Sequence, residues 1–213
     1  MVFLIGGKVR VDILQDMLKA SYLKQKDREK EIQGYVLESF GNRYVAVYYN
    51  KGLNHCIVSF RGTAGTLTDW SYNATYAALG QDKYSQTKRA KAMDPILQKA
   101  IKKYGGENIT IIGHSQGAIA TRKNAKKVNE TITLNPAARF ETQSKNEYTI
   151  RSSMDIVSSA QALGNNLSSI LYPSFNKKRN TTIQSTTNNP LTEHSINILE
   201  RLPQNKMIGK NKS

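Results

Sequence analysis

The stretch that most constrains this chain runs from Asn108 to Ala125 and reads NITIIGHSQGAIATRKNA. It passes from the β-branched segment Ile109–Ile112 through the turn Gly113-His114-Ser115-Gln116-Gly117 into helix-forming residues. Strand, sharp turn and helix around the pattern G-x-S-x-G predict a nucleophile elbow, where glycines two positions before and after the serine prevent a collision between strand and helix. Ser115 would then lie at the tip of the turn, beside the positive end of the helix dipole.

The pattern alone is a weak signal. Glycine and serine are common, so three fixed positions match by chance in roughly one chain of this length in fifteen. The interpretation therefore depends on catalytic partners elsewhere in the chain.

Composition predicts one domain. The chain has 213 residues, 38% of them hydrophobic, and no linker divides it. We expect a single domain over residues 1–203 and a disordered basic tail over 204–213.

The apolar run Met1–Ile5 is too short for a signal-peptide core or for a membrane span of about 20 residues, which favours a cytoplasmic location. Cys56 is the only cysteine, so no intrachain disulfide can form, and its apolar neighbours indicate a buried structural thiol.

The charge is strongly positive, with a formal net value of +15. This balance favours contact with a polyanion, either nucleic acid or an anionic membrane surface. No nucleic-acid motif accompanies the basic residues, which are spread as on an ordinary solvated surface, so no nucleic-acid partner is expected. No cluster of Cys and His has metal-ligand spacing. We expect a monomer without cofactor or metal.

Hydrophobic periodicity predicts an alternation of helices and strands. A packing helix over about 13–24, with Asp12 as N-cap, is followed by a hairpin around Gly41-Asn42 and a buried strand at His55–Phe60. Further expected elements are a helix over 94–104 with Pro95 in its first turn, the elbow strand, the elbow helix to about Lys127, strands at 131–134, 148–151 and 181–184, a helix over 158–171, and a short helix after His194. This order predicts an α/β fold: a mostly parallel central sheet flanked by helices, with an N-terminal helix and hairpin.

A serine nucleophile needs a general base, and histidine suits that role near neutral pH. The chain has three histidines. His55 falls in the buried strand, and His114 occupies an elbow position whose side chain points away from Ser115. His194 remains, in a loop whose mobility would suit proton transfer.

The acid that orients the base should lie between Ser115 and His194, since elbow hydrolases follow the chain order serine, acid, histidine. Two candidates are disfavoured because Glu130 and Glu147 fall at strand starts, the wrong end of a parallel sheet. Glu193 would face elsewhere than its neighbour His194. Asp155, which follows the carboxyl end of a strand, is preferred, and Glu141 stays an alternative.

Together these segments resemble the class 3 (fungal-type) lipases of the α/β-hydrolase superfamily. The resemblance covers about residues 57–194 and rests on an ordered set: Val58-Ser59-Phe60-Arg61-Gly62-Thr63, Asp69-Trp70, Asn73, Gly113-His114-Ser115-Gln116-Gly117, Asp155-Ile156-Val157 and His194. It implies a triad of Ser115, Asp155 and His194, and an oxyanion hole formed by Thr63, through its N–H and hydroxyl, and the N–H of Gln116. The chain departs from the family at Gln116 and Ala118, where Leu and Gly are usual.

The expected function is a serine hydrolase of carboxylic esters, a lipase or phospholipase acting on acyl lipids. A small-ester esterase or thioesterase is one alternative, and a non-catalytic membrane-binding or structural protein that retains the lipase fold is another. The resemblance places a lid over about 64–81, whose apolar side chains would enter a lipid surface. The basic segment Lys83–Lys91 follows, which predicts faster hydrolysis on anionic vesicles than on neutral ones.

Overall fold

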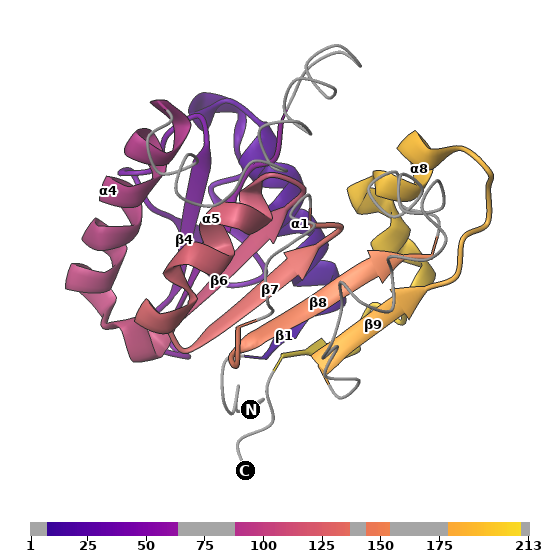
Figure 1. Cartoon of the computed structure of the whole chain (residues 1–213). Coiled ribbons are helices and arrows are strands. Elements are labelled where there is room, and N and C mark those ends of the chain that lie inside the picture. Colours follow the sequence, from indigo (N-terminus) through magenta and orange to yellow (C-terminus); the bar gives the residue numbers. More distant parts are fainter. Residues whose placement is uncertain (1–7, 64–87, 137–143, 154–178, 210–213) are drawn as a thin grey trace.

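A computed structural model of the chain describes residues 8–63, 88–136, 144–153 and 179–209 (Figure 1). Within these residues a sheet of eight strands has the order β2-β3-β4-β5-β6-β7-β8-β9. Its strands are β2 (Glu31–Ile32), β3 (Tyr35–Leu37), β4 (Val45–Asn50), β5 (His55–Phe60), β6 (Ile109–His114), β7 (Glu130–Leu134), β8 (Glu147–Ser152) and β9 (Asn180–Ile183). Neighbours from β2 to β5 are antiparallel and those from β5 to β9 are parallel. The predicted α/β fold with a mostly parallel sheet is confirmed.

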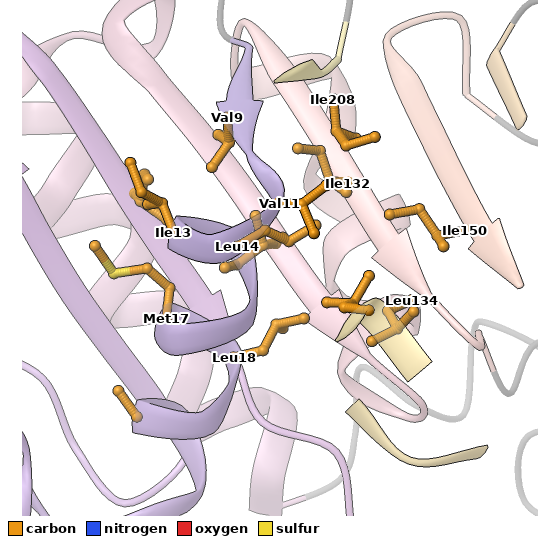
Figure 2. Packing of buried hydrophobic residues seen from close by; sticks show 14 of the residues in the cluster. Val9, Val11, Ile13, Leu14, Met17, Leu18, Ile132, Leu134, Ile150 and Ile208 are labelled. Carbon is orange, nitrogen blue, oxygen red and sulfur yellow. The ribbon is translucent and has the colours of Figure 1, made fainter. Parts of the chain in front are cut away.

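Helices cover both faces of the sheet because the central strands carry apolar side chains on both of their faces. On one face, α1 (Val11–Tyr22) and the 3₁₀ helix η5 (Ile196–Arg201) pack against side chains such as Ile57 and Ile112. On the other face, α4 (Lys88–Tyr104) and α5 (Gly117–Asn124) pack against Val58 and Ile111. Figure 2 shows the first of these cores, with Leu14 and Leu18 of α1 directed toward Ile132 and Leu134 of β7.

The N-terminal helix begins earlier than predicted. It starts at Val11 after Arg10, and Asp12 lies in the first turn rather than at the N-cap. The N–H groups of Val11 and Asp12 donate to the carbonyls of Lys206 and Gln204. Backbone from the other end of the chain therefore satisfies the donors that a side-chain cap would otherwise satisfy.

The C-terminal segment corrects the prediction of a disordered tail over 204–213. Strand β10 (Met207–Ile208) pairs antiparallel with β1 (Val9–Arg10), and Ile208 is fully buried in the core beneath α1. Residues 204–209 are thus ordered against the folded domain, because Ile208 covers the apolar start of α1 and the carbonyls of Gln204 and Lys206 bind its first N–H groups. The last residues of that prediction, 210–213, lie outside the described residues.

Helix α4 also starts earlier than predicted, so Pro95 lies inside it rather than in its first turn. Ala90, Met93, Leu97 and Ala100 are buried at helical spacing, which extends the helix upstream, while the exposed Pro95 faces solvent. A short hairpin of β2 and β3 was not predicted; its turn residues Gln33 and Gly34 both have positive φ.

The remaining described elements are short helices, namely η1 (Gln25–Asp27), η2 (Gly106–Asn108), η3 (Ala125–Lys127) and α8 (Pro190–His194). The predicted helix over 158–171 falls outside the described residues. Among the helices that the structure describes, none has the length and apolar character needed to cross a membrane.

Candidate active site

The elbow forms where the sequence predicts it. Strand β6 ends at His114, Ser115 follows with φ of 54°, and α5 begins at Gly117. A Cβ added at Gly113 would lie 2.2 Å from Thr121 Oγ1, and one at Gly117 would lie 2.2 Å from the Phe60 carbonyl oxygen. Strand and helix therefore approach so closely that only glycine fits on either side of the strained serine.

Ser115 is held from both sides of the turn. Its N–H donates to the carbonyl of Leu134, the last residue of β7, at 3.0 Å, and its own carbonyl accepts from Ala118 at 3.1 Å. The side chain is buried, with 4% exposed. The elbow is thereby fixed both to the neighbouring parallel strand and to its own helix.

His194 lies beside the elbow. The Nε2 atom of His114 donates to the His194 carbonyl at 2.8 Å, and the two imidazole centroids are 5.0 Å apart. His194 is the last residue of α8, with 2% exposed, so the predicted placement in a mobile loop is wrong. The segment is held because its backbone carbonyls bind side chains of the sheet.

A second set of hydrogen bonds holds Glu193, the residue before His194. The Asn135 side chain donates to the Glu193 carbonyl at 3.0 Å and accepts the Ser152 N–H at 2.9 Å. The Glu193 carboxylate accepts from Arg201 at 2.6 and 3.0 Å and from the Ser152 hydroxyl at 2.5 Å. The Arg201 guanidinium is the main cause that holds the pKa of Glu193 far below its ordinary value. Glu193 therefore faces away from its neighbour, as predicted, and anchors the segment that carries His194.

Two of the disfavoured acids have structural roles at the amino ends of their strands. Glu130 pairs with Arg179 at 2.5 Å, and Glu147 pairs with Arg122 at 2.8 Å, both carboxylates fully buried. The two remaining candidates, Asp155 and Glu141, lie outside the described residues. Strand β8 ends at Ser152, whose hydroxyl contacts Glu193. The carboxyl end of β8 therefore lies next to the segment that carries His194.

The proposed oxyanion residues meet at the elbow. Thr63 Oγ1 donates to Gln116 Oε1 at 2.6 Å. Upstream of Thr63, the Arg89 guanidinium donates to the carbonyls of Arg61 and Gly62, the latter at 2.5 Å. Arg89 therefore faces the backbone just before Thr63, although the sequence placed it in a membrane-facing basic segment. The rest of that segment before Lys88, and the expected lid, lie outside the described residues.

The other candidates from the sequence are structural. His55 lies between the Tyr35 hydroxyl at 2.8 Å and Thr110 Oγ1 at 2.9 Å, and burial lowers its pKa to about 4. Cys56 is buried, and burial raises the pKa of its thiol. Both lie at the amino end of β5, whereas Ser115 follows the carboxyl end of the neighbouring parallel strand β6. Among the described residues, no group of three or more His, Cys, Asp or Glu side chains could hold a metal ion.

The strand order and the elbow define the class of fold. Five parallel strands follow an antiparallel start, the strained serine follows β6 at the carboxyl edge of the sheet, and a buried histidine follows β9. This is the α/β-hydrolase fold.

Comparison with solved structures finds fungal lipases among its matches. One is the Lip2 lipase of Yarrowia lipolytica, with 13% identity over 70% of this chain and 72% of that one, at a TM-score of 0.48. Another is described as a fungal lipase, with 14% identity over 95% of this chain and 86% of that one, also at a TM-score of 0.48. No family model and no curated protein matches the sequence. Because the identities and TM-scores of both matches are this low, the fold assignment rests on the chain's own topology.

Proposed function

We propose that this protein is a serine hydrolase of carboxylic esters, with Ser115 as nucleophile and His194 as general base. The observation that carries the proposal is the strained, buried Ser115 at an elbow whose preceding residue is hydrogen-bonded to the backbone of His194. A fold needs no positive φ at a serine for packing alone, whereas an elbow nucleophile requires it.

The reaction follows from these positions. Ser115 Oγ attacks the acyl carbon while His194 takes its proton, and the negative charge develops on the carbonyl oxygen. The N–H groups of Gln116 and Thr63 are the proposed donors to that oxygen, aided by the N-terminal end of α5. His194 then returns the proton to the leaving alcohol, and water activated by His194 hydrolyses the acyl-enzyme.

Asp155 is the proposed acid. It follows β8 by three positions, and β8 ends beside the segment of His194 through the contact of Ser152 with Glu193. A carboxylate there would accept a hydrogen bond from the imidazole and stabilise its charged form. Asp155→Asn should lower kcat by two or more orders of magnitude, while Glu141→Gln, the matched control, should leave it unchanged. The reverse result would move the acid to Glu141.

For the substrate we propose an acyl lipid, as in a lipase or phospholipase, with small esters and thioesters as the alternative. The experiment is a panel of short-chain esters, long-chain esters and phospholipid vesicles, each assayed with wild type and Ser115→Ala. Turnover on long-chain substrates that Ser115→Ala lacks would support the lipid assignment, and turnover on short esters alone would support the esterase. If every member of the panel gave the same rate with both proteins, the hydrolase proposal would fail.

A further inference from the structure

Hydrogen bonds and one close contact join the N-terminal helix to both sides of the proposed active site. Tyr22, the last residue of α1, places its hydroxyl 2.6 Å from His114 Nδ1. The same hydroxyl lies against the Gly62 backbone, so closely that a Cβ added at Gly62 would be 2.3 Å from it. The other imidazole nitrogen of His114 lies 2.8 Å from the His194 carbonyl oxygen. Two side chains thus connect the residue before Thr63 with the backbone of His194.

The His194 carbonyl fixes the direction of these hydrogen bonds, because a carbonyl can only accept. His114 must therefore carry its proton on Nε2, and its Nδ1 accepts from the Tyr22 hydroxyl. The two bonds of the imidazole thus run in one direction, so each polarises the other. A proton on Nδ1 instead would bring two acceptors, Nε2 and the His194 carbonyl oxygen, together and leave that carbonyl without its bond.

We propose that Tyr22 and His114 are positioning residues, which set the distance between the oxyanion loop and the catalytic base. The proposal rests on the proposed function. Neither side chain needs to touch the substrate: Tyr22 holds the backbone just before Thr63, and His114 holds the backbone of His194. Because catalysis depends on the spacing of these groups, a loss of either link should slow the chemical step more than it weakens substrate binding.

The environment keeps the side chains of Tyr22 and His114 neutral. Burial, with the neighbouring His194, lowers the pKa of His114 to about 3, and burial raises the pKa of Tyr22 to about 12 despite the nearby Arg89 and Arg61. Neither group changes its protonation between pH 5 and pH 9. The proton positions on these two side chains should therefore stay the same across the range in which a serine hydrolase works.

The same core contains a matched control. Tyr35 and His55 form the same kind of pair, with the hydroxyl 2.8 Å from Nδ1, but Nε2 of His55 contacts Thr110 instead of an active-site backbone. Tyr22→Phe and Tyr35→Phe therefore remove the same bond at two places. Only the first lies on the path between Gly62 and His194.

The test is the steady-state hydrolysis of a soluble short-chain ester by both variants. We expect Tyr22→Phe to lower kcat about tenfold or more with KM changed less than about twofold, and Tyr35→Phe to retain the wild-type kcat. His114→Gln, which can still donate to the His194 carbonyl, should retain more activity than His114→Ala. An unchanged kcat in Tyr22→Phe, or an equal loss in both phenylalanine variants, would overturn the proposal.

A second measurement does not depend on activity. In ¹⁵N NMR spectra of the histidine rings, His114 should be the Nε2–H tautomer from pH 5 to pH 8, and the Nδ1 resonance should shift in Tyr22→Phe. A proton found on Nδ1 would overturn the hydrogen-bond chain. If wild type hydrolysed no ester, the proposed function would fail, and the tautomer would still decide whether the chain exists.

Discussion

The hydroxyl of Thr63 lies 2.6 Å from the amide oxygen Oε1 of Gln116, a contact between residues 53 positions apart. A hydroxyl has one hydrogen, so while it donates to Gln116 it cannot donate to an oxyanion. Either the hydroxyl rotates during the reaction, or the Gln116 amide turns to present its NH₂ group and releases that hydrogen. In the proposed mechanism, Gln116 thus controls whether Thr63 contributes one donor or two to the oxyanion hole.

Gln116→Leu removes the competing acceptor, and we expect kcat to rise by roughly two- to tenfold, since one neutral hydrogen bond of about 1 kcal/mol no longer has to be broken. Steady-state kinetics on a soluble ester measure this, and KM should stay constant. The gain should disappear in a Thr63→Val background, where kcat is already lower by roughly 10²-fold.

The isosteric change Gln116→Glu gives the opposite sign. A carboxylate binds the Thr63 hydroxyl more tightly and repels the developing oxyanion, so kcat should fall by about tenfold or more. A fall in both Gln116 variants would show that the amide assists the oxyanion hole rather than competing with it.

Arg89 should matter through the oxyanion loop rather than through membrane charge. Its guanidinium binds the carbonyls of Arg61 and Gly62, so Arg89→Gln should lower kcat by about tenfold or more on a soluble ester, at any salt concentration. Lys91 is exposed on the same helix and provides the control, because Lys91→Gln removes the same charge without that contact. Equal kcat values for the two variants would show that the contacts of Arg89 with this backbone do not affect catalysis.

Stability should fall as the pH decreases from 7 to 5. His55 and His114 are buried and neutral, with pKa values of about 4 and about 3, while in the unfolded chain both titrate near the ordinary value of 6.5. The unfolded state therefore binds more protons in this window, and each histidine should cost on the order of 1–2 kcal/mol of unfolding free energy. Glu193, whose pKa is lowered, acts in the same direction only below about pH 4.5, its ordinary value.

Urea unfolding at pH 7 and pH 5 measures this dependence, and His55→Asn should make it shallower. Ring chemical shifts of both histidines should stay constant over the same range. A stability that did not change between pH 7 and pH 5 would mean that the folded protein accepts these protons.

The elbow could be predicted because its information is local. Gly113 and Gly117 have no room for a side chain, and β-branched residues mark the strand before them. His194 followed by elimination, since the chain holds only three histidines. The central strands were also confirmed, because their apolar runs are continuous and buried.

The contacts that hold the site together could not be predicted in this way. Tyr22 and Arg89 occupy helices whose periodicity indicates only packing or solvent. Tyr22 binds the ring of His114, 92 positions away, and Arg89 binds backbone carbonyls, and neither contact has a signal in the sequence. Strand β10 was missed because a pair of two-residue strands has no measurable period. The early start of α4 has a signal in the spacing of Ala90 and Met93, but Pro95 is typical of a first turn and so indicates a later start.

The central claim is that Ser115 is an activated nucleophile, and labelling by a fluorophosphonate probe tests it most directly. The wild-type protein should be labelled once, with the mass shift on the peptide that contains Ser115. Labelling should be absent in Ser115→Ala and at least about a hundredfold slower in His194→Ala, because an unactivated serine hydroxyl reacts poorly. A wild-type protein that is folded but unlabelled, or one labelled equally well without His194, would contradict the account.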